Sequence, residues 1–342
     1  MAFHDFSDYR AVSRLKALAE RPHDLTAPDG LSAERIAALR ASSCGFDLLY
    51  ATQRVNDEVL DALQALADEA GLVETFRAMK GGAVLNRIDG FDSENRQVLH
   101  TASRDVFTEP PAAPEASARA RAELDKLRAF LKDLNRGRLV NAQGQPFTTM
   151  VQVGIGGSDL GPPALYLALK AHAVEGRSAR FIANVDPDDA AEVLQGLDLS
   201  RTLVNIVSKS GTTLETLTNE RLVCAALEKA GLDPARHLLA VTGEGSPMDD
   251  PSRYLASFYM FDSIGGRYSA TSMVGAVTLG FALGMEAVLD ILRGAHQMDL
   301  AAEEPDIRRN LPLLMALLGI WNHNFLGSRT VAILPYSQAL SR

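Results

Sequence analysis

Residues 203–213 read LVNIVSKSGTT, an apolar run that breaks into a loop of small and hydroxyl-bearing side chains. The run predicts a short buried strand, and the pattern after the loop predicts a helix. Such a loop presents unpaired backbone N–H groups and hydroxyls at a helix N-terminus, where the helix dipole also favours negative charge. The stretch therefore predicts a phosphate-binding loop, formed by Ser208, Lys209, Ser210, Gly211, Thr212 and Thr213.

The composition of this loop narrows the kind of phosphate it could bind. No Gly-Lys pair occurs anywhere in the chain, which excludes a Walker A loop. A hydroxyl-rich loop that is poor in glycine fits a sugar phosphate better than a triphosphate. The alternative is a connecting loop that uses Ser, Thr and Gly for structural reasons alone.

A second candidate loop, GIGGSDLGP at residues 154–162, follows the apolar run 150–153. It begins like a dinucleotide-binding fingerprint, but Asp159 stands where the third glycine is required, so that interpretation fails. Gly157 would let a ligand approach the backbone closely, and Ser158 offers a hydroxyl donor. A tight turn that uses glycine only for positive φ is the alternative. Three glycines within four residues favour binding.

A third candidate loop contains Gly265, Gly266 and Arg267 and follows the apolar run 258–261. A guanidinium is always charged and planar, and it suits either a phosphate or an enolate-like oxygen that gains charge during a reaction. A lone arginine is more often a solvated surface charge. Its place directly after a predicted strand, in a chain with two other such loops, favours a role in the site.

These three segments, in this order, resemble the phosphoglucose isomerase family, which interconverts glucose 6-phosphate and fructose 6-phosphate. Residues 93–100, SENRQVLH, resemble the N-terminal signature of the family. Residues 310–322 and then 332–336 resemble the stretch that leads into its second domain. The resemblance covers nearly the whole chain, although residues 88–90 and 136–146 fit the family pattern loosely.

The resemblance implies an aldose–ketose isomerisation through a cis-enediol(ate), with Arg267 as the catalytic residue that stabilises it. It also implies sugar or phosphate contacts from Gly157, Ser158 and Gly266 beside the phosphate-binding loop. Family members carry the glutamate base, a histidine that assists ring opening and a lysine in a later portion, so we expect these residues beyond residue 342. We expect no cofactor, no metal, and a homodimer for the full-length protein.

Two residues within the chain are weaker candidates for the base. Glu215 lies two residues after the phosphate-binding loop, where a phosphate dianion would repel its carboxylate. His100 is a single imidazole in an N-terminal segment and is more often structural. Two other functions remain as alternatives: a non-catalytic sugar-phosphate-binding module, and a nucleotide-dependent oxidoreductase. The failed glycine fingerprint disfavours the oxidoreductase, and Arg267 favours the isomerase over the module.

The spacing of apolar runs after residue 148 predicts strands separated by helices, hence a parallel sheet covered on both faces. The predicted strands are 149–153, 179–184, 202–207, 237–241 and 258–261. The fold class is therefore α/β, a doubly wound parallel sheet of the sugar-isomerase type. We expect a helical region over 1–120, the α/β domain over 121–285, and the start of a second α/β domain over 286–342.

Other segments have their own predictions. Asn56 is expected to cap a helix with an apolar face from Val59 to Ala67. Residues 108–118 are expected to form a linker, and 273–301 and 313–325 are expected to be helical. Residues 330–336 predict a buried strand of a second sheet. One such strand cannot cover its own faces, so we expect the chain to be a shortened protein.

Composition excludes several classes of function. Across 342 residues, 46% are hydrophobic and 23% charged, which is typical of a folded globular protein. The net charge of −9 argues against nucleic acid and an anionic membrane as partners. Cys44 and Cys224 are expected to be buried thiols in helices. Because neither a signal peptide nor a membrane span is apparent, we expect a cytoplasmic enzyme.

Overall fold

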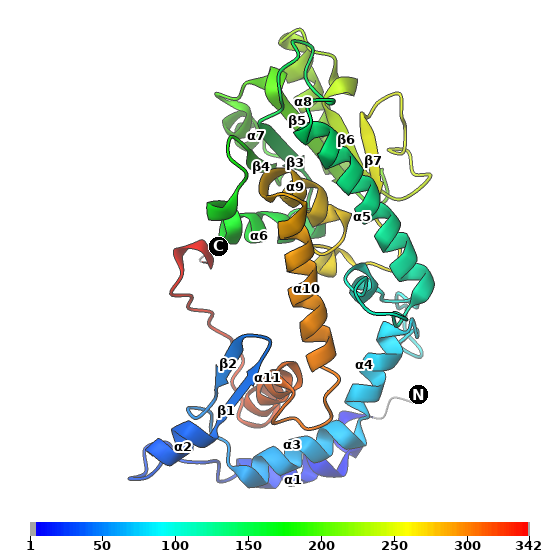
Figure 1. Ribbon diagram of the computed structural model, residues 1–342. Coiled ribbons are helices and arrows are strands. Elements are labelled where there is room, and N and C mark those ends of the chain that lie inside the picture. Colours follow the sequence, from blue (N-terminus) through cyan, green and yellow to red (C-terminus); the bar gives the residue numbers. More distant parts are fainter. Residues whose placement is uncertain (1–4, 341–342) are drawn as a thin grey trace. The chain divides into compact units, whose positions relative to one another are not determined.

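The computed structural model describes residues 5–340 and divides the chain into two compact units (Figure 1). The helical unit contains the chain up to Gly81 together with Gly294–Ile333. The sheet unit contains Gly82–Arg293 and the chain from Leu334 onward. All three candidate loops belong to the sheet unit.

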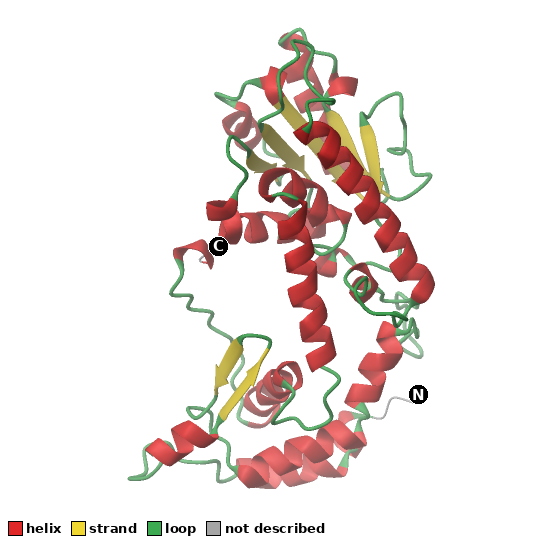
Figure 2. Cartoon of the chain, viewed as in Figure 1, coloured by secondary structure: helices red, strands yellow, loops and turns green. Residues whose placement is uncertain are grey.

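The sheet unit is built on five parallel strands in the order β4-β3-β5-β6-β7 (Figure 2). Their bounds are β3 Thr149–Val153, β4 Ser178–Ile182, β5 Thr202–Ser208, β6 Leu238–Thr242 and β7 Ala256–Tyr259. All five predicted strands are therefore confirmed, with ends that differ by at most two residues. The chain adds β4 on one side of β3 and then β5 on the other, so the strand order reverses between β3 and β5. The predicted doubly wound α/β fold is confirmed.

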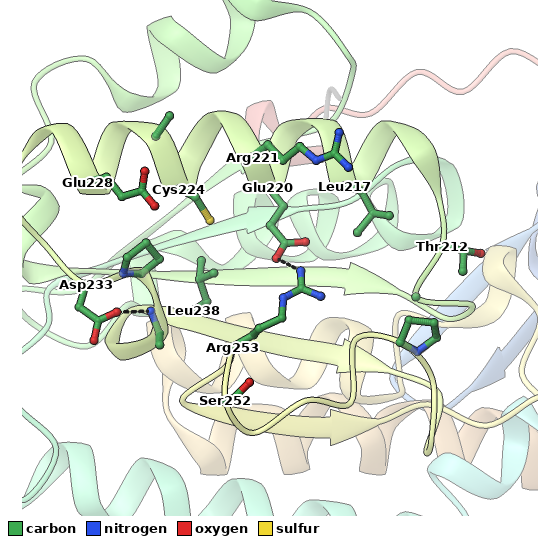
Figure 3. Close-up of a pocket in the computed structure, with 15 residues that line it drawn as sticks. Thr212, Leu217, Glu220, Arg221, Cys224, Glu228, Asp233, Leu238, Ser252 and Arg253 are labelled. Carbon is green, nitrogen blue, oxygen red and sulfur yellow. Dashed lines mark hydrogen bonds and ion pairs between the residues drawn. The ribbon is translucent and has the colours of Figure 1, made fainter.

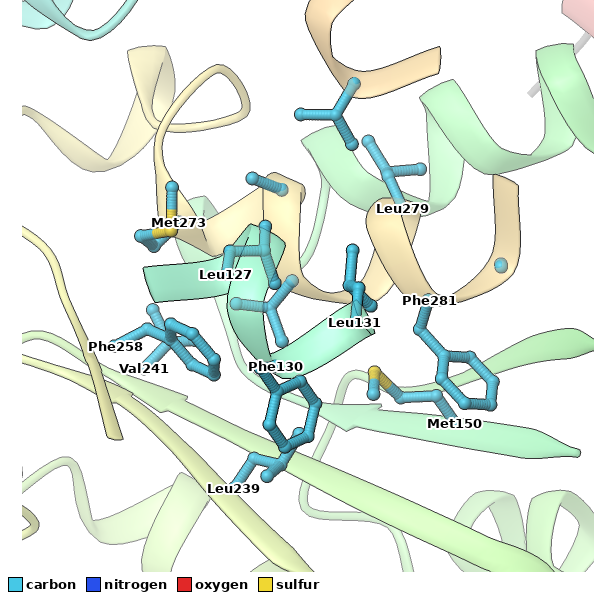
Figure 4. Close-up of a cluster of buried hydrophobic side chains, with 14 of the residues drawn as sticks. Leu127, Phe130, Leu131, Met150, Leu239, Val241, Phe258, Met273, Leu279 and Phe281 are labelled. Carbon is cyan, nitrogen blue, oxygen red and sulfur yellow. The ribbon is translucent and has the colours of Figure 1, made fainter. Parts of the chain in front are cut away.

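Helices cover both faces of this sheet because side chains alternate along each strand. Met150 points to the face covered by α5 (Pro114–Asn135) and α9 (Met273–Leu283). It belongs there to one buried apolar cluster with Leu127, Phe258 and Phe281, and the Phe281 ring lies beside it (Figure 4). Val151 points to the opposite face, where its cluster includes side chains of α7 (Pro187–Leu194) and α8 (Leu214–Lys229). Every residue of β5 is buried, as expected for the centre of a two-faced sheet.

The helical unit packs short helices around one apolar cluster. Its elements are α1 Arg10–Ala19, α2 Ala33–Ala38, β1 Arg40–Ser43, β2 Phe46–Leu49, α3 Asp57–Glu69, α4 Leu72–Lys80 and α11 Leu311–Ile320. Leu15, Leu60 and Trp321 are fully buried in that cluster. Asn56 caps α3 as predicted, because its Oδ1 accepts a hydrogen bond from the Val59 amide at 3.0 Å. Helix α10 (Met285–Ala301) runs from one unit into the other.

Several predictions about local structure were wrong. Residues 40–49 form an antiparallel hairpin that the sequence did not predict, and Cys44 lies exposed in its turn with φ +52° instead of in a helix. Residues 114–118 begin α5 instead of extending the linker. The helical region 273–301 is broken at Gly284, whose φ of +91° ends α9.

The predicted strand at 330–336 is also not formed. These residues are exposed and irregular, with Val331 and Ile333 91% and 83% exposed. Their composition favours a strand, but a strand forms only beside another strand, and none pairs with them within residues 5–340. The division into segments 1–120, 121–285 and 286–342 stays a prediction. No helix in the described part of the chain is both long and apolar enough to cross a membrane.

Candidate functional site

The strand order reverses between β3 and β5. Doubly wound sheets bind ligands at such a point, because the connections leave it in opposite directions and no loop covers it. The Gly154–Gly161 segment follows β3, and the predicted phosphate-binding loop follows β5. These two candidate loops therefore follow the two strands between which the order reverses.

The loop after β5 ends at the N-terminus of α8, which begins at Leu214. Thr213 is the N-cap, but in the part of the chain that the structure describes no side chain caps this helix. Its first amides therefore lack hydrogen-bond partners inside the helix and can bind an anion. The Ser208 Oγ and Thr213 Oγ1 atoms lie 2.8 Å apart and thus bring the two ends of the loop together.

The shape of this loop depends on Gly211 and on the segment behind it. Gly211 has φ +67°, and a Cβ there would come within 2.9 Å of the Ser246 Oγ. Thr242 on β6 donates a hydrogen bond from its Oγ1 to the Ser208 carbonyl at 2.7 Å. On the exposed side, the Ser210 Oγ accepts bonds from the Thr212 amide and hydroxyl at 3.1 and 3.0 Å. The loop is therefore closely supported from behind and presents hydroxyls outward.

The glycines after β3 allow the close contact that this site requires. A Cβ at Gly154 would lie 2.6 Å from the Ser158 carbonyl oxygen, and a Cβ at Gly157 would lie 2.5 Å from the Gly266 main chain. The buried Gln152 donates from its Nε2 to the Ser158 carbonyl at 2.9 Å and so holds the loop from below. The backbone of the glycine loop thus touches the backbone that precedes Arg267.

A single hydroxyl joins the loops after β3 and β7. The Ser269 Oγ lies 3.0 Å from the Gly157 carbonyl oxygen and 2.7 Å from the Gly266 carbonyl oxygen. Beside this contact is a cavity of about 480 Å³. It is lined by Gly156, Gly157, Leu160, Gly161, Gly266, Arg267 and Ala270. The loop after β5 is not part of this cavity, so the candidate residues form two adjacent surfaces.

Arg267 lies in a short 3₁₀ turn, Gly266–Tyr268, and its side chain is exposed. Among residues 5–340 it forms no hydrogen bond or ion pair, so its guanidinium donors face solvent. The neighbouring Tyr268 stacks on His100, with ring centroids 4.7 Å apart and planes inclined by 22°. His100 therefore supports the Arg267 turn, while Glu215 is exposed in the first turn of α8.

Lys209 points toward the third loop. Its Nζ donates to the carbonyl oxygens of Ile264 at 3.2 Å and Asp262 at 3.4 Å. Partial burial lowers the pKa of its ammonium group, and the nearby Arg96 guanidinium lowers it further. Lys209 thus bridges the loops after β5 and β7, and its direct contact with a phosphate stays a prediction.

Asp159 is a candidate residue that the sequence identified only as a mismatch to the glycine fingerprint. The residue is 8% exposed, and burial together with the Asp189 carboxylate raises the pKa of its carboxyl to about 6. It follows Ser158 directly, so its charge is part of the electrostatics of the site. Its ionisation equilibrium lies close to neutral pH, which its sequence position alone did not indicate.

A larger cavity, of about 650 Å³, runs along α8 (Figure 3). Glu220 lies in its wall and accepts hydrogen bonds from Arg253 Nη2 at 2.7 Å and from the Tyr254 hydroxyl at 2.8 Å. Burial raises the pKa of the Cys224 thiol there to about 11, which makes it a weak nucleophile. This cavity shares only Gly211 and Thr212 with the candidate site. No group of side chains within residues 5–340 has the composition to hold a metal ion.

Comparison with known proteins identifies the family. The phosphoglucose isomerase family model matches residues 49–342. The chain belongs to the phosphoglucose isomerase family. It is 57% identical over 344 residues to a glucose-6-phosphate isomerase from Desulfotalea psychrophila, covering 98% of this chain and 64% of that protein. It is 51% identical over 341 residues to one from Protochlamydia amoebophila, covering 98% of this chain and 62% of that protein.

Two solved structures are similar to the chain, and one of them is a glucose-6-phosphate isomerase. The crystal structure of a glucose-6-phosphate isomerase from Chlamydia trachomatis matches with a TM-score of 0.93 and 48% identity, covering 98% of this chain and 64% of that one. A hypothetical protein from Thermus thermophilus matches with a TM-score of 0.52 and 28% identity, covering 77% of this chain and 54% of that one. The chain spans less than two thirds of the length of the relatives it matches.

Proposed function

We propose that this chain provides the sugar-phosphate-binding part of a glucose-6-phosphate isomerase. The reaction interconverts glucose 6-phosphate and fructose 6-phosphate through a cis-enediol(ate), and it belongs to glycolysis and gluconeogenesis. One observation carries the proposal: the hydroxyl loop at the uncapped N-terminus of α8 and the glycine loop flank the reversal of strand order, with Arg267 held against the glycine loop.

The chemistry explains why these groups belong together. An aldose–ketose isomerisation moves a proton between C2 and C1 and a second proton between the two oxygens. A fixed phosphate orients the sugar, so that the reacting carbons meet the same groups in every catalytic cycle. We assign this binding to Ser208, Ser210, Thr212, Thr213 and the free amides of α8.

The enediolate needs a fixed positive charge near the developing oxyanion. We assign this role to Arg267, whose guanidinium faces solvent beside the cavity formed with Gly157 and Gly266. The chain has a net charge of −9, so attraction of a phosphate dianion depends on local charge. Lys209, Arg267 and the α8 N-terminus supply that charge. The proton-moving base is assigned to a residue beyond 342.

The experiment is a titration of the chain with fructose 6-phosphate in a calorimeter. The double variant Ser208→Ala, Thr213→Val removes two hydroxyls, and we expect about tenfold weaker binding or more, since a lost hydrogen bond to a charged group costs roughly 1.5–3 kcal/mol. Thr218→Val, which removes an exposed hydroxyl bonded within α8, is the matched control. Unchanged affinity for fructose 6-phosphate in the double variant would refute the assignment of this segment as a phosphate-binding loop.

The alternative function is a non-catalytic sugar-phosphate-binding module. Conversion of fructose 6-phosphate to glucose 6-phosphate by the purified chain, with Arg267→Ala as control for contaminating host enzyme, would exclude the non-catalytic module. Binding of fructose 6-phosphate without its conversion would fit the non-catalytic module as well as the proposed function. Isomerase activity that is lost in Arg267→Ala would require a base within the 342 residues. In that case Glu215 and His100 become the candidates.

We also propose that the full-length protein acts in the cytoplasm as a homodimer on small sugar phosphates. The net charge of −9 of this chain supports the small-molecule substrate, because it disfavours nucleic acid and anionic membranes as partners. Size-exclusion chromatography with light scattering tests the oligomeric state.

A further inference from the structure

The loop that carries Arg267 is held by three successive main-chain carbonyls. The Asp262 carbonyl oxygen accepts from Arg96 Nη1 at 3.3 Å and from Lys209 Nζ at 3.4 Å. The Ser263 oxygen accepts from the Leu99 amide at 2.8 Å, and the Ile264 oxygen accepts from Lys209 Nζ at 3.2 Å. Two segments distant in sequence, 96–99 and Lys209, therefore fasten one short stretch of backbone.

Arg96 is itself held in place on its other side. Its Nε and Nη2 atoms lie 3.0 and 2.8 Å from the Glu94 Oε2 atom, and its amide donates to the Asn86 Oδ1 at 3.0 Å. Its side chain is 36% exposed, so water competes with these bonds only in part. A guanidinium held in this way has little freedom left to lose when it bonds the Asp262 carbonyl.

The two ends of the loop are fixed by hydrogen bonds, and its middle is supported by the stacking of Tyr268 on His100. Asp262–Ile264 is fastened by Arg96, Leu99 and Lys209, and Ser269 bonds the Gly157 and Gly266 carbonyls at the other end. Between them lie two glycines and Arg267, whose guanidinium has no partner among the described residues. The placement of that guanidinium therefore depends on where the main chain is held.

We propose that Arg96 is a positioning residue, which together with Lys209 clamps the Asp262–Ile264 backbone and so places the Arg267 guanidinium over the substrate. The effect of Arg96 on substrate binding rests on the proposed isomerase site, whereas the clamp on the Asp262–Ile264 backbone does not. Arg96 lies in the segment 93–100. The resemblance of this segment to the family signature does not assign a role to Arg96. The geometry provides that role, since the Arg96 guanidinium bonds the Asp262 carbonyl and the Glu94 carboxylate.

The first test measures hydrogen exchange of the ligand-free chain by mass spectrometry. The Ile264, Tyr268 and Ser269 amides are hydrogen-bonded within the loop, so their exchange reports its opening. We expect these amides to exchange about five to ten times faster in Arg96→Gln, because the charge-assisted hydrogen bond from Arg96 to the Asp262 carbonyl is lost. Arg96→Lys should restore most of the protection. Arg87→Gln, which breaks an exposed ion pair with Asp89, should leave them unchanged.

The second test separates the clamp from the proposed function. Inorganic phosphate needs only the loop after β5, whereas fructose 6-phosphate also needs Arg267. Arg96→Gln should therefore weaken fructose 6-phosphate binding about fivefold and phosphate binding hardly at all. If the unmodified chain bound no fructose 6-phosphate, the proposed function would fail, and the exchange experiment would still decide the clamp. Unchanged loop exchange in Arg96→Gln, or an equal rise throughout the sheet unit, would overturn the proposal.

Discussion

The contact between Gly157 and Gly266 can be tested with one methyl group. A Cβ added at Gly157 would lie 2.5 Å from the Gly266 Cα and carbonyl carbon, whereas ordinary contact begins at 3.4 Å, so one loop must retreat by roughly 0.9 Å. The obstacle is backbone, which cannot rotate away as a side chain can. We expect Gly157→Ala to lower the free energy of unfolding by about 1–3 kcal/mol, the usual cost of overpacking.

The same stretch of sequence offers two matched controls. Gly265 has φ −72°, and a methyl group added there would meet nothing within 4 Å, so Gly265→Ala should be neutral or stabilise by about 0.4–1 kcal/mol through the unfolded chain. A Cβ at Gly266 would lie 3.4 Å from the Gly157 Cα, an ordinary contact, so Gly266→Ala should fall between the other two. The three variants change glycine to alanine in one site and differ only in what the methyl group meets.

Urea unfolding followed by far-UV circular dichroism measures these differences. Dichroism is the suitable probe because the single tryptophan, Trp321, is buried in the helical unit and reports that unit by fluorescence. Fructose 6-phosphate titration of the folded variants adds a second measure, since displaced loops should bind more weakly. A Gly157→Ala variant no less stable than Gly265→Ala would refute the close approach of the two loops.

Two further predictions concern titratable groups. Asp159→Asn should stabilise the chain by roughly 2 kcal/mol at pH 8 and by much less near pH 4. The reason is that the pKa of the Asp159 carboxyl is raised to about 6, so folding is disfavoured only when this carboxyl is ionised. Urea unfolding at both pH values measures the difference, and an equal gain in stability at each pH would contradict the prediction. One thiol should react rapidly with a disulfide reagent at pH 8, because Cys44 is exposed whereas burial raises the pKa of Cys224 to about 11. Cys44→Ser should abolish that rapid reaction, and its survival would contradict the assignment.

Much of the sheet unit could be predicted from local pattern. A fully buried strand such as β5 is apolar along its whole length, and hydroxyl or glycine residues mark the turn that follows it. Because connections between parallel strands are right-handed, a series of such units has few possible arrangements. The loops after β3 and β5 lie at one edge of the sheet because both strands run in the same direction.

Predictions from local sequence pattern were wrong where pairing with a neighbouring strand decides the structure. Residues 330–336 have the composition of a strand, yet they are exposed because no described strand pairs with them. The hairpin at 40–49 escaped prediction because its turn is formed by Cys44 and Gly45, not by the usual Asn-Gly or Asp-Gly pair. In both cases pairing decided the outcome, and pairing is not encoded within the segment itself.

Within the candidate site, the sequence by itself determined which residue types follow each strand and that a hydroxyl-rich loop precedes α8. These features depend on neighbours along the chain, through helix-end amides and the conformational freedom of glycine. Only the tertiary structure decided that Gly157 meets Gly266, that Lys209 bonds the Ile264 carbonyl, and that Asp159 is buried near Asp189. Long side chains and loop backbones find such partners across the sheet, and burial changes their charge equilibria, so these properties arise from the packing of distant segments.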